Sequence, residues 1–152
     1  MQKTYKRKGG KGKGTRKMRP DMSLAAFQKE ITVRFLEMLL LIKLFHWKTT
    51  GYAIHKATDD LHFKLSESVD SFVEIMLGKH GGRVQLQSQT TLTVKDYAST
   101  AKDSFKKEIE EYKVFLQNLT NTLDASKDSD LLNIRDEMLG QLNQFTYLLT
   151  LN

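Results

Sequence analysis

Hydrophobic residues recur along most of this chain every three or four positions, a spacing that places them on one face of an α-helix. Residues that favour helix starts precede two of these stripes: Asp21 and Ser23 lie before the first, and Asp96 lies before the third. The pattern therefore indicates an all-α protein. The four helices that it predicts span about residues 23–49, 52–79, 96–123 and 129–151.

The lengths of the connections indicate how these helices are arranged. Thr49, Thr50 and Gly51 form a short turn between the first two helices, whereas a polar stretch over residues 78–95 separates the second helix from the third. That stretch is too long for a tight turn and predicts a long crossover, with or without a short helix of its own. Two helix pairs joined by one long crossover form the ferritin-like variant of the four-helix bundle. We therefore predict a ferritin-like bundle domain over residues 21–152.

Two helix faces carry more specific predictions. Residues 39–42 are apolar almost all round the first helix, which indicates burial on more than one side and a subunit interface in addition to the core. In the third helix, the charged residues between Lys106 and Lys113 predict a solvated face of mixed charge.

Charge is distributed unevenly along the 152 residues. Nine of the 24 Lys and Arg residues lie in residues 1–20, which contain no acidic residue, so this segment carries a charge of +9. The other 15 basic and 18 acidic residues give the rest of the chain a charge of −3. Residues 1–20 also contain four glycines and no helical pattern. They cannot bury enough surface to offset their ordering entropy, so we predict a disordered basic tail.

A flexible polycation of this kind typically contacts a polyanion, and we predict that the tail binds DNA. No base-reading motif is present, so the binding is expected to be phosphate-driven, sequence-independent and sensitive to salt. A purely solubilising tail is the alternative. The predicted DNA-binding residues are Lys3, Lys6, Arg7, Lys8, Lys11, Lys13, Arg16, Lys17 and Arg19.

Composition and hydropathy exclude several classes. The chain has no cysteine, which rules out disulfides, zinc fingers and thiol catalysis. The most apolar run, residues 35–47, is too short to span a bilayer and contains Glu37 and Lys43. No apolar run follows the basic first residues, so no secretory signal is expected. We therefore expect a cytoplasmic protein that is not secreted and makes no membrane contact.

Candidate chemistry is concentrated between His46 and Glu74, where His55, Asp59 and Asp70 complete a set of two imidazoles and three carboxylates. This is a ligand set for iron, manganese or zinc. His55 with Asp59, and Asp70 with Glu74, are spaced i,i+4 and so share helix faces. Asp59 and Asp70 lie about 16 Å apart along one helix, so one chain cannot bring both pairs to one ion. Either two half-sites act separately, or two antiparallel chains complete each other's sites.

These residues resemble the ferroxidase motif of the Dps family, the ferritin-like DNA-binding proteins from starved cells. The resemblance covers mainly residues 25–80. It implies a two-fold dimer within a hollow dodecamer that oxidises Fe(II), preferentially with peroxide, and stores the iron. It also implies that the histidines and Asp59 come from one chain and the later carboxylates from its two-fold mate, that Trp47 packs near the site, and that the Lys-rich tail binds DNA. The matching strings are His46-Trp47-x3-Gly51, His55-x3-Asp59 and Asp70-x3-Glu74.

The chain also departs from the family pattern. The interval between His46 and His55 is shorter than in typical bacterial members, with the missing residues after Gly51. The strings FLEML, FHWKTTGYAIHKATD and NQFTYLLTL are similar to those of ferritin-like proteins of large DNA viruses. Two functions therefore stay open. One is a nucleoid-associated mini-ferritin with ferroxidase activity. The other is a non-catalytic structural or DNA-packaging protein of a virion or viral factory, with a vestigial site.

Overall fold

The computed structural model describes residues 22–86 and 90–151, and all the regular structure within these ranges is helical. This confirms the prediction of an all-α chain with four long helices. The predicted tail, residues 1–20, lies outside the described residues. The elements are α1 (Leu24–Lys48), α2 (Tyr52–His80), α3 (Lys102–Asn118), the short 3-10 helix η1 (Leu119–Asn121) and α4 (Ser129–Leu148).

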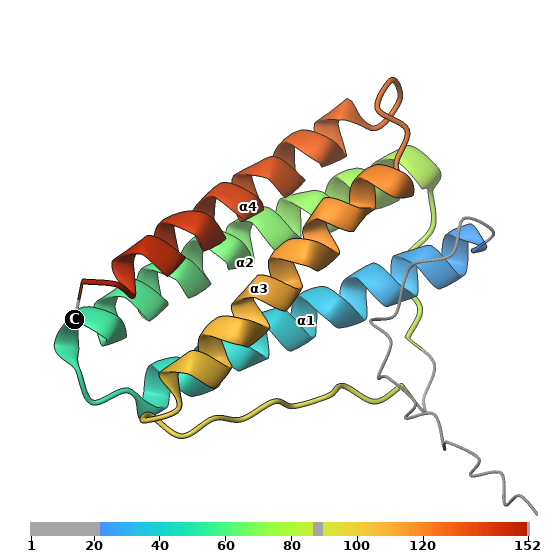
Figure 1. The fold of residues 1–152 in the computed structure, drawn as a ribbon. Helices are drawn as coiled ribbons and strands as arrows, with labels where there is room; N and C mark the ends of the chain where they lie inside the picture. Colours follow the sequence, from blue (N-terminus) through green and yellow to red (C-terminus); the bar gives the residue numbers. More distant parts are fainter. Residues whose placement is uncertain (1–21, 87–89, 152) are drawn as a thin grey trace, which may run out of the picture.

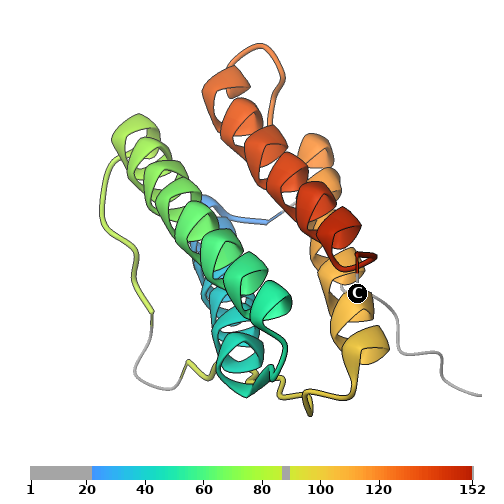
Figure 2. The same ribbon diagram turned by 90° about the vertical axis from the view of Figure 1, so that its left-hand side faces the viewer.

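The helices form a bundle in which α2 contacts both α1 and α4, and α3 packs against α4. Both views show that α1 and α2 run in opposite directions, as do α3 and α4 (Figures 1 and 2). The end of α1, the starts of α2 and α3, and the end of α4 therefore lie together at one end of the bundle. The connection from α2 to α3 runs along the bundle between its two ends (Figure 1), and none of its described residues is helical.

Local chemistry accounts for the boundaries of the first two helices. Ser23 caps α1 as predicted, because its Oγ accepts a hydrogen bond from the backbone N–H of Ala26 at 3.3 Å. At the other end of the pair, α2 stops at Gly81, whose φ of 75° lies in the left-handed region that glycine adopts without strain. The α1–α2 pair is thus delimited by an N-cap and a glycine C-cap.

Two buried carboxylates fasten the connection between α2 and α3 to the bundle. Glu37 of α1 accepts a hydrogen bond from the backbone N–H of Thr93 at 2.8 Å. Glu108 of α3 accepts a hydrogen bond from the hydroxyl of Tyr97 at 2.7 Å and forms an ion pair with Lys95. Of the two possibilities left open by the sequence, the described residues of this connection show the one without a short helix, and side-chain contacts hold the connection in place.

Two predictions about α3 were wrong, the first for its cap and the second for part of its solvated face. Asp96 does not cap the helix, which begins only at Lys102; its carboxylate instead binds Nζ of Lys48 at 2.5 Å. Glu108 is buried, because the preceding connection covers it. Lys113 is also buried and donates a hydrogen bond to the hydroxyl of Thr146 on α4 at 2.8 Å. The face that was expected to be solvated thus contains two charged residues that hold neighbouring segments in place.

Aromatic side chains from all four helices meet in the core. The ring of Phe35 contacts that of Phe72 edge to face, with 5.2 Å between centroids, and so joins α1 to α2. Phe45 stacks on Phe105 at 3.8 Å and joins α1 to α3. Phe105 in turn meets Phe145 of α4 at 6.0 Å. These contacts join α1 to α2 within the first helix pair and, through Phe105, join α1 to both helices of the second pair.

Candidate metal centre at the α1–α2 turn

Two of the predicted ligands, His46 and His55, lie against each other at the turn between α1 and α2. Their rings stack with 4.0 Å between centroids and 25° between planes. His46 lies in the last turn of α1 and is 6% exposed, whereas His55 lies in the first turn of α2 and is exposed. The short turn that ends at Gly51 allows the two helix ends to bring the rings into contact.

The Nδ1 atoms of both rings face backbone carbonyls across the turn. Nδ1 of His46 lies 3.1 Å from the carbonyl oxygen of His55, and Nδ1 of His55 lies 3.3 Å from that of His46. A carbonyl oxygen can only accept a hydrogen bond, so both contacts assign the proton to Nδ1. In the neutral form of each ring, Nε2 then carries a lone pair, and an imidazole held in one tautomer by a backbone carbonyl is a common form of metal-binding histidine.

Thr58 supports this arrangement from within the core and was not identified from the sequence. Its side chain is completely buried, and Oγ1 lies 3.1 Å from Nδ1 of His46. The same hydroxyl donates a hydrogen bond to the carbonyl of Ile54 at 2.8 Å, so its lone pairs are available to the Nδ1–H group. The only sequence signal was its position one helical turn after Ile54.

The carboxylate of Asp59 lies beside the Nε2 atom of His46. Its Oδ1 is 3.8 Å from that Nε2 and 4.0 Å from Nζ of Lys43. When the His46 ring is neutral with its proton on Nδ1, a nitrogen lone pair and a carboxylate oxygen lie close together, and a neighbouring cation stabilises both. Lys43 provides that charge, and its ammonium lies 5.9 Å from the ring centroid of Trp47. The sequence signal for Lys43, its i,i+3 spacing before His46, was overlooked.

His62 extends the polar cluster by one turn of α2 and is half-buried. Burial lowers the pKa of this imidazole, and the charges of Lys43 and of His46 in its protonated form act in the same direction, while Asp59 raises it. The neutral form, which carries a lone pair, is therefore favoured. The i,i+3 spacing from Asp59 could have indicated this residue, which looks like a surface histidine in the sequence alone.

Asp70 and Glu74 do not join this cluster within one chain. Both are exposed on α2, although the sequence places them beside apolar residues. The helix is continuous, so the rise of about 1.5 Å per residue keeps Asp70 about 16 Å from Asp59 along its axis. In the part of the chain that the structure describes, no group of three or more His, Asp or Glu residues could hold a metal ion. A site that uses all five predicted ligands therefore requires a second chain.

Two features of α1 bear on such a contact between chains. Trp47 is 67% exposed, so the packing expected of it does not occur within one chain. In residues 39–42, Leu41 and Ile42 are buried in the core, whereas Leu40 is 37% exposed. The run thus faces both the core and the surface, and the subunit interface at its exposed side stays a prediction.

Two further predictions concern partners of the chain: the tail binds DNA, and the protein makes no membrane contact. All nine predicted DNA-binding residues lie in residues 1–20, outside the described residues. Among the described residues, no helix is both long enough and apolar enough to cross a bilayer.

A model of a protein family whose description is "Family of unknown function (DUF5856)" matches residues 46–149. The matched range contains all five predicted metal ligands and the last three helices, and it excludes the tail and most of α1. No curated protein and no solved structure matches the chain.

Proposed function

Because the chain belongs to the DUF5856 family of unknown function, we propose a function from its own residues: it is a Dps-like mini-ferritin that oxidises and stores Fe(II). Iron is the substrate, bound where two chains meet. His46, His55 and Asp59 come from one chain, and Asp70 and Glu74 come from its partner. The protein assembles through a two-fold dimer into a closed shell and associates with DNA through its basic tail.

The observation that carries this proposal is the reciprocal pair of contacts between the His46 and His55 rings and each other's backbone carbonyls. They place a proton on Nδ1 of each ring, which leaves Nε2 as the nitrogen that can bind a metal ion when the ring is neutral, and the Asp59 carboxylate lies 3.8 Å from one of these nitrogens. Imidazole nitrogens and carboxylate oxygens are donors that suit Fe(II). Within one chain these three side chains do not form a metal site, so the proposal needs the partner's carboxylates to complete it.

The exposed carboxylates on α2 support a shared site. Asp70 and Glu74 form no ion pair with another described residue, and they lie on the same helix as His55, about 22 Å and 28 Å further along it. A two-fold axis that pairs α2 with a second α2 in antiparallel orientation would bring these carboxylates to the partner's histidines, and would do so twice. The proposal of a ferritin-like bundle is supported by the α2–α3 connection, which runs along the bundle (Figure 1), because one long connection between two helix pairs is expected of that fold.

The proposed reaction requires the protein to hold two Fe(II) ions near one peroxide molecule. Each Fe(II) loses one electron, and the peroxide O–O bond breaks as peroxide takes up two electrons and two protons to leave as two water molecules. The imidazoles and carboxylates bind and orient the ions, and no side chain needs to act as a nucleophile. The Fe(III) formed is then hydrolysed and stored inside the shell.

The double variant Asp70→Ala/Glu74→Ala tests the proposal. Both side chains are exposed, so the helical circular dichroism spectrum should be unchanged while peroxide-dependent oxidation of Fe(II) is abolished. The matched control is Asp103→Ala/Glu137→Ala, which removes two exposed carboxylates from α3 and α4 and should retain the wild-type rate. Wild-type oxidation in the Asp70/Glu74 variant would refute the assignment.

A second candidate is a non-catalytic, ferritin-like protein that packages DNA, in a virion for example. Lys43 favours it, because an ammonium 4.0 Å from Asp59 already neutralises the carboxylate without a metal ion. This candidate predicts that the wild-type protein shifts DNA but oxidises Fe(II) no faster than buffer does.

A further inference from the structure

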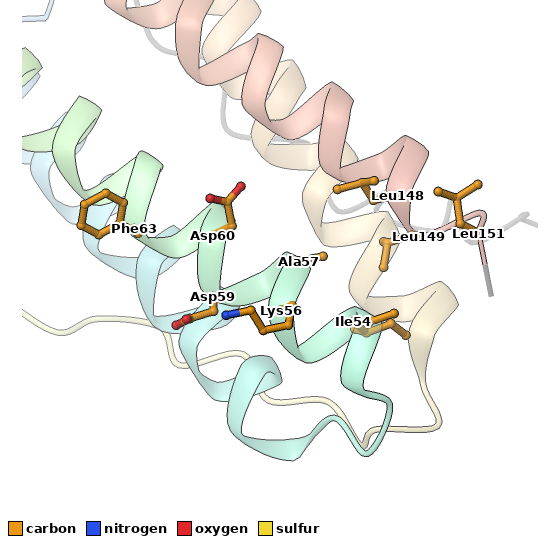
Figure 3. Close-up of a pocket in the computed structure, with 10 residues that line it drawn as sticks. Ile54, Lys56, Ala57, Asp59, Asp60, Phe63, Leu148, Leu149 and Leu151 are labelled. Carbon is orange, nitrogen blue, oxygen red and sulfur yellow. The ribbon is translucent and has the colours of Figure 1, made fainter.

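An open groove of about 640 Å³ lies between the start of α2 and the end of α4. Ile54 and Ala57 of α2 line it opposite Leu148 of α4, and Leu151 closes the end beside the chain terminus (Figure 3). Phe63 borders the groove further along α2 and is 62% exposed. Its volume lies within the range of small-molecule binding sites, and its lining is mostly apolar, which is also typical of them.

Three charged residues, all on α2, line the groove: Lys56, Asp59 and Asp60. Asp60 is neutralised by an ion pair with Lys64 at 2.7 Å, and Asp59 lies 4.0 Å from the ammonium of Lys43. Lys56, in contrast, is exposed and makes no ion pair or side-chain hydrogen bond with any described residue. Among the charged residues that line the groove, Lys56 is therefore the one without an opposite charge beside it, and its ammonium lies at the border of the groove.

We propose that this groove binds a single-chain amphiphile with an anionic head, namely a free medium-chain fatty carboxylate. Its alkyl chain lies between α2 and α4 against Ile54, Ala57 and Leu148, where apolar contact removes it from water. Its carboxylate pairs with the ammonium of Lys56. This inference goes beyond the proposed iron chemistry. Asp59 borders both sites, but the contacts proposed for the fatty carboxylate are made by Lys56 and the apolar wall, and by none of the five predicted metal ligands.

Calorimetric titration of the full chain with decanoate, below its micellar concentration, tests the proposal. Decanol and decyltrimethylammonium are the matched probes, since they keep the ten-carbon chain and remove or reverse the charge of the head. Decanoate should bind saturably with one molecule per chain and more tightly than either. Equal affinity for all three probes, or uptake without saturation, would overturn the proposal.

Two variants locate the site. Lys56→Glu should weaken decanoate binding about fivefold or more, the scale of an exposed ion pair lost and reversed, and should strengthen decyltrimethylammonium binding. Ala53→Leu places a larger side chain at an exposed position of the groove wall and should weaken binding of all three probes. Lys107→Glu makes the same charge change on the exposed face of α3 and should leave every affinity unchanged.

The same samples test whether the groove is occupied by a second copy of the chain and not by a fatty carboxylate. If another copy of the chain fills the groove, light scattering should show self-association that Ala53→Leu abolishes, and decanoate should bind to no variant. That result would refute the fatty carboxylate. Decanoate binding that is lost in Lys56→Glu and retained in Lys107→Glu supports it.

Discussion

The carboxylate of Glu108 should make the stability of the protein depend on pH, and Glu108→Gln measures this directly. Burial alone raises the pKa of this group, but hydrogen bonds from Lys95 and Tyr97 outweigh it, so the pKa of Glu108 lies below its ordinary value of 4.5. A lowered folded-state pKa stabilises the native protein above the unfolded-state value. That contribution is lost as the pH falls through the folded-state pKa.

The magnitude follows from the two contacts. The amide of Glu108→Gln can still accept the Tyr97 hydrogen bond, but it loses the charge that binds Lys95. A hydrogen bond to a charged group contributes about 1.5–3 kcal/mol. The Lys95 side chain is 32% exposed and can turn to water, so we expect a loss near the lower end, about 1–2 kcal/mol at pH 7.

Urea denaturation, followed by circular dichroism at several pH values, provides the assay. The stability difference between wild type and Glu108→Gln should be largest at neutral pH and should shrink toward zero as the pH falls below 4.5. Glu137→Gln, an exposed change on α4, is the control and should have little effect. A difference that is constant with pH, or absent at pH 7, would refute the reasoning.

A second readout of the same variant is the phenol of Tyr97. Its hydrogen bond to Glu108, together with burial and the nearby carboxylates, raises the pKa of Tyr97 to about 12. Removal of the Glu108 charge should move this titration toward the ordinary value of 10.0, as measured by ultraviolet absorbance. No change in the phenol titration would show that the two groups do not interact in solution.

Three further predictions concern other parts of the chain. Phe35→Ala should lower the free energy of unfolding by about 3–5 kcal/mol, because it removes a fully buried ring that contacts α2. Urea denaturation measures this loss, and a value under about 1 kcal/mol would contradict the packing of Phe35. Ser23→Ala should cost about 1 kcal/mol through loss of the α1 cap, and Ser23→Asn should restore most of it. Deletion of residues 1–19 should abolish the retention of DNA in gel shifts at low salt, and an undiminished shift would refute DNA binding by the tail.

The periodicity of hydrophobic residues was sufficient to predict the helices, because each helix buries a regular stripe. The first two helices and their turn were predicted almost to the residue, and Ser23 was a correct cap. The start of α3 was not, because Asp96 looks like a cap in the sequence while in the structure it binds a lysine of α1. Contacts between segments distant in sequence leave no local pattern.

The candidate site shows the same limit. Spacing along the chain identified His46, His55 and Asp59, and the structure places all three at the α1–α2 turn. The contributions of Lys43 and Thr58 depend on how α1 and α2 pack side by side. Glu108 was predicted to be solvated because its sequence neighbours are charged. Only the fold shows that the α2–α3 connection covers it.

If the iron site is shared by two chains, two variants that are inactive alone should restore each other's activity in mixed dimers. His46→Ala/His55→Ala and Asp70→Ala/Glu74→Ala should each fail to oxidise Fe(II) with peroxide. When they are co-expressed in equal amounts, half of the dimers are mixed and each mixed dimer has one intact site. The mixture should therefore recover about a quarter of the wild-type rate. A mixture as inactive as its components, beside an active wild type, would contradict a shared site.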